Sequence, residues 1–266
     1  MKKILLTLGG SAALFVFLFG MNTINKATII NKTNTTSQNS PANKTLKGFA
    51  LIELFTSEGC SSCPPADELV NKLSKEKKDN VYILAYHVDY WNRLGWKDKF
   101  SKAAYSKRQQ DYSELLNLNG PYTPQIVVNG KEEFVGSDKT SLYAAINKTT
   151  AENNDNSIYI YINATVKNNE ISVSYKASKV DNASINFALV ELANSSQVKS
   201  GENEGRFLQH TNIVTDLKSL PASGNENEIS FSKPADKSFI ASNYKLVAFL
   251  QKKSGEIIAV GESMIK

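Results

Sequence analysis

Cysteine and histidine are scarce in this chain. Two cysteines and two histidines occur among its 266 residues. Neither cysteine therefore has any partner for an internal disulfide except the other one. A closed tetrahedral zinc site would have to use both cysteines, Cys60 and Cys63, together with both histidines, His87 and His210.

Several common functional signatures are missing as well. No phosphate-binding loop, nucleotide-binding fingerprint or serine triad is evident. The net charge is only +5, and the lysines are spread along the chain instead of forming one basic stripe, so we expect no nucleic-acid binding. With 41% hydrophobic and 21% charged residues, the chain after its first residues has the composition of a soluble globular protein of one large or two ordinary domains.

The N-terminus has the pattern of an export signal. Met1-Lys2-Lys3 precedes the apolar run Ile4 to Gly20. No small-x-small cleavage site closes this run, which is nearly long enough to span a bilayer. We therefore predict that residues 1–21 are a signal peptide or an N-terminal anchor, the only membrane contact, and that the protein is exported to the periplasm or cell envelope. Residues 22–47 are polar and Asn/Thr-rich, which predicts a flexible linker.

Residues 48–152 alternate between strand and helix patterns. The predicted order is strand, helix, strand, helix, hairpin and helix, at Phe49–Phe55, from Cys63 to Lys75, Val81–Val88, Ser101–Leu118, around Asn129-Gly130, and Ser141–Thr150. Pro64 and Pro65 suit a first helical turn, so the second cysteine of the pair lies at the helix N-terminus. Helix N-terminal N–H groups favour a thiolate, and a dithiol at a strand-to-helix junction therefore indicates redox chemistry.

Four stretches of this segment, CSSCPPAD, HVDYW, LGWKD and YTPQ, resemble one secreted thioredoxin-like family, domain of unknown function 1223. The resemblance implies a thioredoxin-like fold, with Cys60 as the attacking nucleophile and Cys63 as the resolving thiol. Cys60, in the turn, should be the more exposed of the two. Pro124 matches the cis-proline that faces the dithiol in such folds, so Thr123-Pro124 should bind substrate. The family carries no settled substrate.

Other side chains have two interpretations each. His87 and Asp89 lie two apart at a strand end, and an Asp-oriented imidazole would transfer protons for the dithiol; a histidine satisfied by backbone is the alternative. Trp91 could wall the substrate site or, like Trp96, anchor a loop. We interpret Arg108 and Asp111 as a solvated pair on a helix surface.

The sequence thus predicts a thiol–disulfide oxidoreductase that acts on a protein thiol or disulfide partner, with an unidentified electron donor or acceptor. The redox-active disulfide needs no dissociable cofactor. The first alternative is a copper-binding protein, with Cys60, Cys63 and His87 (or His210) as soft-metal ligands. A non-catalytic envelope binding module is the second.

In residues 156–266 the pattern changes, and apolar residues recur at every second position. Short alternating strands at 158–166, 171–175, 185–192, 229–231, 244–252 and 256–261 predict an all-β antiparallel sandwich. Residues 201–220 interrupt this rhythm. The stretch Arg206–Val214 either forms an interface strand that brings His210 toward the first domain or is a surface strand with an ordinary histidine; we favour the surface strand.

Overall fold

The computed structural model describes residues 48–152, 155, 157–224, 226–234 and 239–266. The predicted signal or anchor (1–21) and the predicted linker (22–47) lie outside the described residues. Within the described part of the chain, no helix is long and apolar enough to cross a membrane.

The first half of the described chain has the predicted order of elements. They are β1 (Ala50–Thr56), α1 (Pro64–Lys75), β2 (Val81–His87), the short 3₁₀ helix η1 (Asn92–Leu94), α2 (Ala103–Leu115), β3 (Gln125–Val128), β4 (Glu132–Val135) and α3 (Lys139–Ala151). Helix α1 starts at the two prolines because the N–H groups of a first turn need no partner inside the helix. The strand and helix prediction for this segment is confirmed.

The hairpin between β3 and β4 is also confirmed, with one difference. Asn129 and Gly130 have φ values of 49° and 67°, the left-handed conformation that an Asn-Gly turn uses. Val128 pairs with Glu132, so Lys131 belongs to the loop too, which is one residue longer than the predicted two-residue turn.

The described part of the second half is all β apart from one 3₁₀ turn, η2 (Ala241–Asn243). Its strands are β5 (Ile160–Lys167), β6 (Glu170–Ala177), β7 (Lys179–Gln197), β8 (Phe207–Ser223), β9 (Glu226–Ser232), β10 (Tyr244–Lys252) and β11 (Ile257–Met264). Strand β8 begins at Phe207, so the strand that both interpretations of Arg206–Val214 required is confirmed, and it continues to Ser223. The buried polar side chains His210 and Asn212 interrupt the apolar alternation within it.

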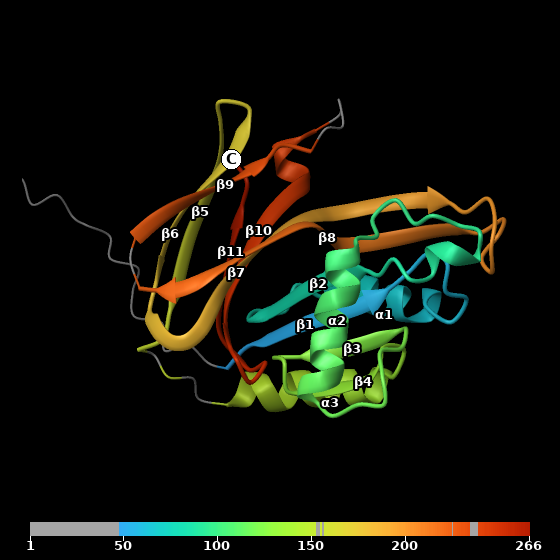
Figure 1. Cartoon of the computed structure of the whole chain (residues 1–266), viewed down its shortest axis with the longest axis horizontal. Coiled ribbons are helices and arrows are strands. Elements are labelled where there is room, and N and C mark those ends of the chain that lie inside the picture. The colour runs from blue at the N-terminus through green and yellow to red at the C-terminus, as the bar shows by residue number, and fades with distance from the viewer. Residues whose placement is uncertain (1–47, 153–154, 156, 225, 235–238) are drawn as a thin grey trace, which may run out of the picture. The chain divides into compact units, whose positions relative to one another are not determined.

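One eight-stranded sheet runs through both halves, in the order β11-β10-β7-β8-β2-β1-β3-β4 (Figure 1). Strand β2 lies parallel to β1 on one side and to β8 on the other, with Ala85 opposite Ile213 in the β2–β8 pairing. A three-stranded sheet, β5-β6-β9, packs on the C-terminal part. The fold class is confirmed: a thioredoxin-like α/β part precedes an all-β antiparallel sandwich. The division into domains 48–152 and 156–266 stays a prediction.

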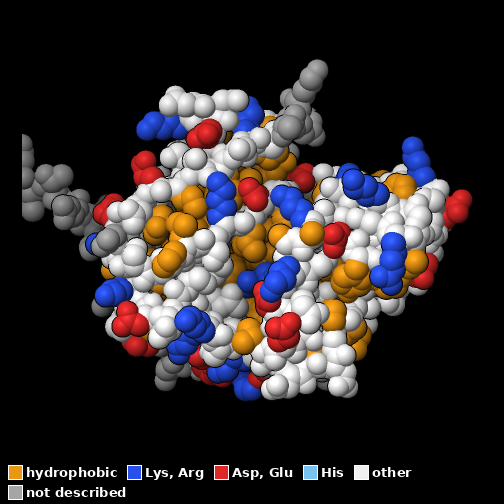
Figure 2. Space-filling model, in the orientation of Figure 1, with side chains coloured by type: hydrophobic (Ala, Val, Ile, Leu, Met, Phe, Trp, Pro, Cys, Tyr) orange, Lys and Arg blue, Asp and Glu red, His pale blue; other side chains and the backbone are white. Residues whose placement is uncertain are grey.

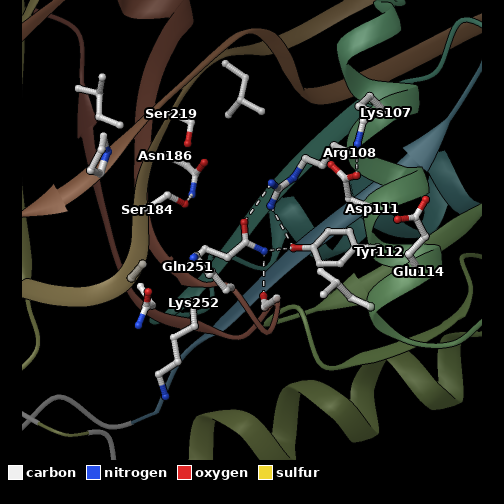
Figure 3. A pocket seen from close by; sticks show the side chains of 18 of the residues that line it. Lys107, Arg108, Asp111, Tyr112, Glu114, Ser184, Asn186, Ser219, Gln251 and Lys252 are labelled. Atoms are coloured by element: carbon white, nitrogen blue, oxygen red, sulfur yellow. Dashed lines mark hydrogen bonds and ion pairs between the residues drawn. The ribbon is translucent and has the colours of Figure 1, made fainter.

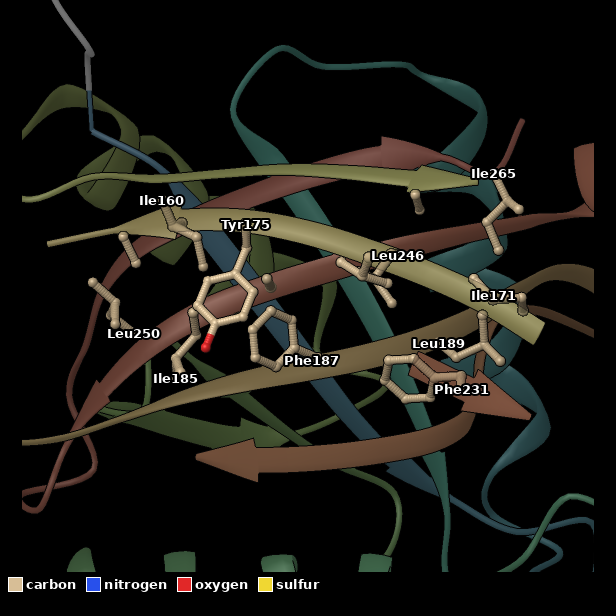
Figure 4. Close-up of a cluster of buried hydrophobic side chains, with 14 of the residues drawn as sticks. Ile160, Ile171, Tyr175, Ile185, Phe187, Leu189, Phe231, Leu246, Leu250 and Ile265 are labelled. Carbon is tan, nitrogen blue, oxygen red and sulfur yellow. The ribbon is translucent and has the colours of Figure 1, made fainter. Parts of the chain in front are cut away.

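Three groups of buried side chains hold these layers. Tyr175, Phe187 and Phe231 fill the space between the two sheets (Figure 4). On the eight-stranded sheet, α2 covers one face over a second group that includes Phe55 and Tyr86. Helices α1 and α3 cover the other face over a third group. The carboxyl ends of β1 and β2 therefore meet beside the start of α1 and the neighbouring strand β8, where the cysteines lie.

Candidate functional site

The two cysteines form a disulfide in the turn that joins β1 to α1. Cys63 is the N-cap residue of α1, and its carbonyl accepts hydrogen bonds from the N–H groups of Ala66 and Asp67. In the reduced protein the Cys63 sulfur would lie at the N-terminus of α1, the positive end of the helix dipole, and Cys60 would lie in the turn before it. This position favours a thiolate.

Thr123 and Pro124 face the disulfide, as predicted. The Thr123–Pro124 peptide bond is cis, which confirms that prediction. The Thr123 hydroxyl donates a hydrogen bond to the Cys60 sulfur over 3.3 Å, and the Trp91 Nε1–H donates to that hydroxyl oxygen over 2.8 Å. Ser62 Oγ lies 3.3 Å from the same sulfur and donates to the Thr123 carbonyl. The structure thus brings Thr123, Pro124 and Trp91 together with Cys60.

Both cysteine side chains are fully buried, so the prediction that Cys60 is the more exposed is wrong. The loop between β7 and β8, residues 198–206, binds the backbone of the turn that holds Cys60. Asn203 Nδ2 donates to the carbonyls of Glu58 and Cys60, each over 2.9 Å, and Glu202 Oε2 accepts the Ser61 N–H over 3.0 Å. No sequence signal marked this contact, because it joins residues more than 140 positions apart.

His87 is oriented by an aspartate, but not by the predicted one. Its Nδ1 lies 2.7 Å from Asp98 Oδ2, whereas Asp89 accepts a hydrogen bond from the Ser106 hydroxyl. Strand β2 ends at His87, so the alternation that would have put Asp89 on the same face does not continue. Asp98 returns from the following loop and also accepts the Glu58 N–H over 2.9 Å.

His210 is buried, with 3% of its surface exposed, so the favoured interpretation of an ordinary surface histidine is wrong. Its Nε2 lies 3.3 Å from Glu58 Oε1, and its Nδ1 lies 3.9 Å from Asp67 Oδ2. Its ring meets the His87 ring edge-on at 4.7 Å between centroids. Strand β8 therefore carries His210 to the base of the dithiol turn, the interface role that was the alternative interpretation.

The charges of these side chains are coupled. Burial works to lower the pKa of His210, but the carboxylates of Asp67 and Glu58 outweigh it and raise that pKa to about 10. Burial likewise works to raise the pKa of Glu58, yet its partner His210 and the Trp96 N–H hold it below its usual value. For Asp98, burial is again outweighed, here by His87 and two backbone N–H groups, and the pKa is lowered.

Hydrogen bonding in this cluster is incomplete. Glu58 Oε1, His87 Nε2 and both ring nitrogens of His210 are buried without a well-aligned hydrogen-bond partner in the described part of the chain. His210 and Glu58 are within ion-pair range, but their geometry does not make a directed hydrogen bond. Such incompletely bonded polar groups are uncommon in protein interiors.

Arg108 has a different role from the predicted solvated pair with Asp111. Its Nε donates to Glu53 Oε1 over 2.7 Å, and its other nitrogens donate to Gln251 and to the Tyr112 hydroxyl. Asp111 instead accepts from Lys107. All of these side chains except Glu53 line a pocket of about 1000 Å³ between α2 and the strands β7, β8 and β10 (Figure 3). On this face charged groups of both signs are interspersed (Figure 2). Neither cysteine lines the pocket.

Among the described residues, no group of three or more His, Cys, Asp and Glu side chains is arranged to hold a metal ion. Of the alternative copper ligands, Cys60 and Cys63 are bonded to each other, and His87 contacts Asp98, Phe100 and His210. The copper interpretation stays a prediction.

Comparisons with known proteins agree with this fold. The chain is 31% identical to a thioredoxin of Methanocaldococcus jannaschii over 98 residues. The aligned residues make up 36% of this chain and 92% of the thioredoxin. A crystal structure of an Agrobacterium tumefaciens protein is 26% identical, with a TM-score of 0.62 over 83% of this chain and 95% of that chain. HBP35 of Porphyromonas gingivalis shares the fold at 16% identity, with a TM-score of 0.56 over 83% of this chain and 76% of its own.

The family model described as a protein of unknown function (DUF1223) matches residues 51–251, which span the dithiol, the Thr123–Pro124 bond and strand β8. This chain belongs to the DUF1223 family.

Proposed function

We propose that this protein is an exported thiol–disulfide oxidoreductase that acts on a protein partner through Cys60 and Cys63. One observation carries the proposal: a disulfide at the start of a helix is faced by Thr123-Pro124, with the Thr123 hydroxyl donating to the Cys60 sulfur. The 31% sequence identity to a thioredoxin over 98 residues supports the same chemistry. Export rests on the pattern of residues 1–21.

The reduced protein would act in two steps. The Cys60 thiolate attacks one sulfur of a partner disulfide, a mixed disulfide forms, and the other partner sulfur leaves and takes up a proton. The Cys63 thiol then loses its proton and attacks the Cys60 sulfur, so that the partner is released with its second sulfur reduced and protonated. The protein is left with its own disulfide. Run in reverse, the same steps oxidise a partner dithiol.

Other residues have supporting roles in this proposal. Thr123 and Pro124 would contact the partner backbone, and Trp91 would hold the Thr123 hydroxyl in place. His87, oriented by Asp98, would carry protons to and from the dithiol. No dissociable cofactor is needed, and an electron donor or acceptor of matching potential would set the direction of exchange.

The test is disulfide exchange with insulin as a model substrate, measured with dithiothreitol as reductant. We expect the wild-type protein to accelerate reduction, Cys60→Ser to abolish the acceleration, and Cys63→Ser to accumulate a mixed disulfide that mass spectrometry detects. Activity that Cys60→Ser leaves unchanged would contradict the proposal and favour a non-catalytic envelope module.

A titration of the reduced protein with Cu(I) separates the remaining alternative. Tight one-to-one binding that Cys63→Ser removes, together with no exchange activity in the wild-type protein, would replace the oxidoreductase with a copper-binding protein. Cell fractionation of the full chain tests export: the proposal requires the protein in the periplasm or envelope fraction.

A further inference from the structure

The buried cluster below the dithiol contains a charge that the thioredoxin-like segment 48–152 does not supply. His210 lies on β8, between two carboxylates of the first half of the chain. Glu58 is two residues before Cys60. Asp67 is four residues after Cys63 on α1, a spacing that puts the two Cβ atoms about 5–6 Å apart. The two carboxylates therefore lie on either side of the dithiol in the sequence, and His210 approaches both of them.

These carboxylates work against a thiolate, because like charges repel strongly in a buried, poorly solvated site. Within the described residues, neither Glu58 nor Asp67 lies within 4 Å of a lysine or arginine nitrogen. His210 is the side chain that approaches both. The other titratable groups at the cluster are His87, in ring contact with His210, and Asp98, which binds His87.

We propose that His210 is a positioning residue of the redox site: its imidazolium offsets Glu58 and Asp67 and so sets the reduction potential of the Cys60–Cys63 pair. This inference rests on the proposed thiol–disulfide chemistry. It makes strand β8, and with it the C-terminal half of the chain, part of the redox machinery. The pKa of His210, raised to about 10 by its acidic neighbours, keeps the ring charged at neutral pH.

The incomplete hydrogen bonding supports this role over a purely structural one. A histidine that only joined β8 to α1 would be expected to donate well-aligned hydrogen bonds, as buried polar groups generally do. His210 instead has both ring nitrogens within 4 Å of carboxylate oxygens without a directed bond to either. The charge of the His210 ring therefore acts on both carboxylates at once.

The experiment is a redox titration of the folded protein against glutathione or dithiothreitol buffers, with the thiol state read by mass spectrometry after alkylation. At pH 8 we expect His210→Gln to make the pair more reducing by about tenfold in its equilibrium constant, roughly 30 mV for a two-electron couple. Glu58→Gln should shift it in the opposite direction. Cys60 alkylation by iodoacetamide should slow in His210→Gln and accelerate in Glu58→Gln.

His210→Lys restores a positive charge and should return the potential toward the wild-type value. In His210→Gln the difference from wild type should shrink as the pH falls, because two buried carboxylates without their cation take up a proton. Ile213→Val is the matched control, a neutral change three residues further along the same buried strand, and should leave the potential unchanged.

Equal potentials in wild type, His210→Gln and Glu58→Gln would overturn the inference, as would shifts of the same sign in both variants. The outcome is separable from that of the proposed function, since a potential can be titrated whether or not insulin is reduced. Exchange-active wild-type protein with unshifted variants contradicts the role of His210 alone. Wild-type protein without exchange activity contradicts the proposed function alone.

Discussion

Two buried ionic clusters lie on opposite faces of the eight-stranded sheet, and both join the two halves of the chain. Glu53 and Thr56 are three residues apart in β1 and so point to opposite faces. Glu53 pairs with Arg108 of α2, which also binds Gln251 of β10. Thr56 binds Asp67 of α1, beside His210 of β8. Strand β1 thus contributes a side chain to both clusters, one on the face covered by α2 and the other near the dithiol.

The two clusters differ in how completely their charged side chains are bonded. Arg108 donates to three acceptors, and its guanidinium also lies over the rings of Tyr86, Tyr112 and Phe249. At the dithiol, the nitrogens of His210 and one oxygen of Glu58 lack directed hydrogen bonds. The saturated Arg108 cluster is suited to stability, whereas the charges of His210, Glu58 and Asp67 lie around the dithiol turn, where they act on a thiolate. The following variants test that difference.

The largest effect should come from breaking the saturated cluster. Arg108→Met leaves the fully buried Glu53 carboxylate without its cation, so we expect a loss of about 3–5 kcal/mol in the free energy of unfolding, measured by urea denaturation. The reduction potential of the dithiol should not change. A Glu53→Gln/Arg108→Met double variant should recover part of the lost stability, because it leaves no unpaired charge. A change in the reduction potential of the dithiol in Arg108→Met would contradict this distinction between the two clusters.

His210→Gln should destabilise the protein less, by about 1–3 kcal/mol at pH 6, the cost of leaving buried polar groups without their partner. The sign of the pH dependence follows from the raised pKa. The stabilisation is complete below the unfolded value of about 6.5 and is lost as the pH rises toward the folded value of about 10. Urea denaturation at pH 6, 8 and 10 should therefore show the variant approaching wild type. A constant difference over that range would contradict the charged imidazole.

Asn203→Ala tests the loop that binds the turn of the disulfide. The amide of Asn203 bridges the carbonyls of Glu58 and Cys60, and its loss should cost about 1–2 kcal/mol. The more informative result is kinetic: reduction by a water-soluble phosphine should become several-fold faster, because Cys60 is buried and this loop binds its carbonyl. Glu204→Ala, an exposed change in the same loop, is the control. An unchanged reduction rate would show that the loop does not limit access.

The local parts of this molecule could be predicted from the sequence. The strand before Cys60, the helix after Cys63 and the hairpin at Asn129-Gly130 depend on neighbouring residues, through apolar runs, proline position and turn chemistry. The cis Thr123–Pro124 bond that faces the disulfide was predicted from the family resemblance. Each of these features was expected and is present.

The parts that failed depend on contacts between distant segments. Asp98 replaces Asp89 at His87 because a loop folds back onto the strand end, which no spacing rule describes. His210 and Asn203 reach the dithiol because β8 pairs in parallel with β2, across more than 120 residues of chain. Within β8, His210 is a polar residue at a buried position, so nothing in the sequence indicated that this face of the strand is covered. The residues most relevant to chemistry were therefore the hardest to place.

The smallest expected effect concerns the edge of the dithiol site that is independent of the buried charges. Thr123→Val removes the hydroxyl that donates to the Cys60 sulfur and accepts from Trp91. A hydrogen bond to a thiolate favours the charged form, so the variant should raise the pKa of the Cys60 thiol and slow its alkylation a few-fold at pH 7. Unlike His210→Gln, it should leave the pH dependence of stability unchanged. Thr123→Ser, which keeps the hydroxyl, should react like wild type; slow alkylation in both variants would assign the effect to packing instead of the hydrogen bond.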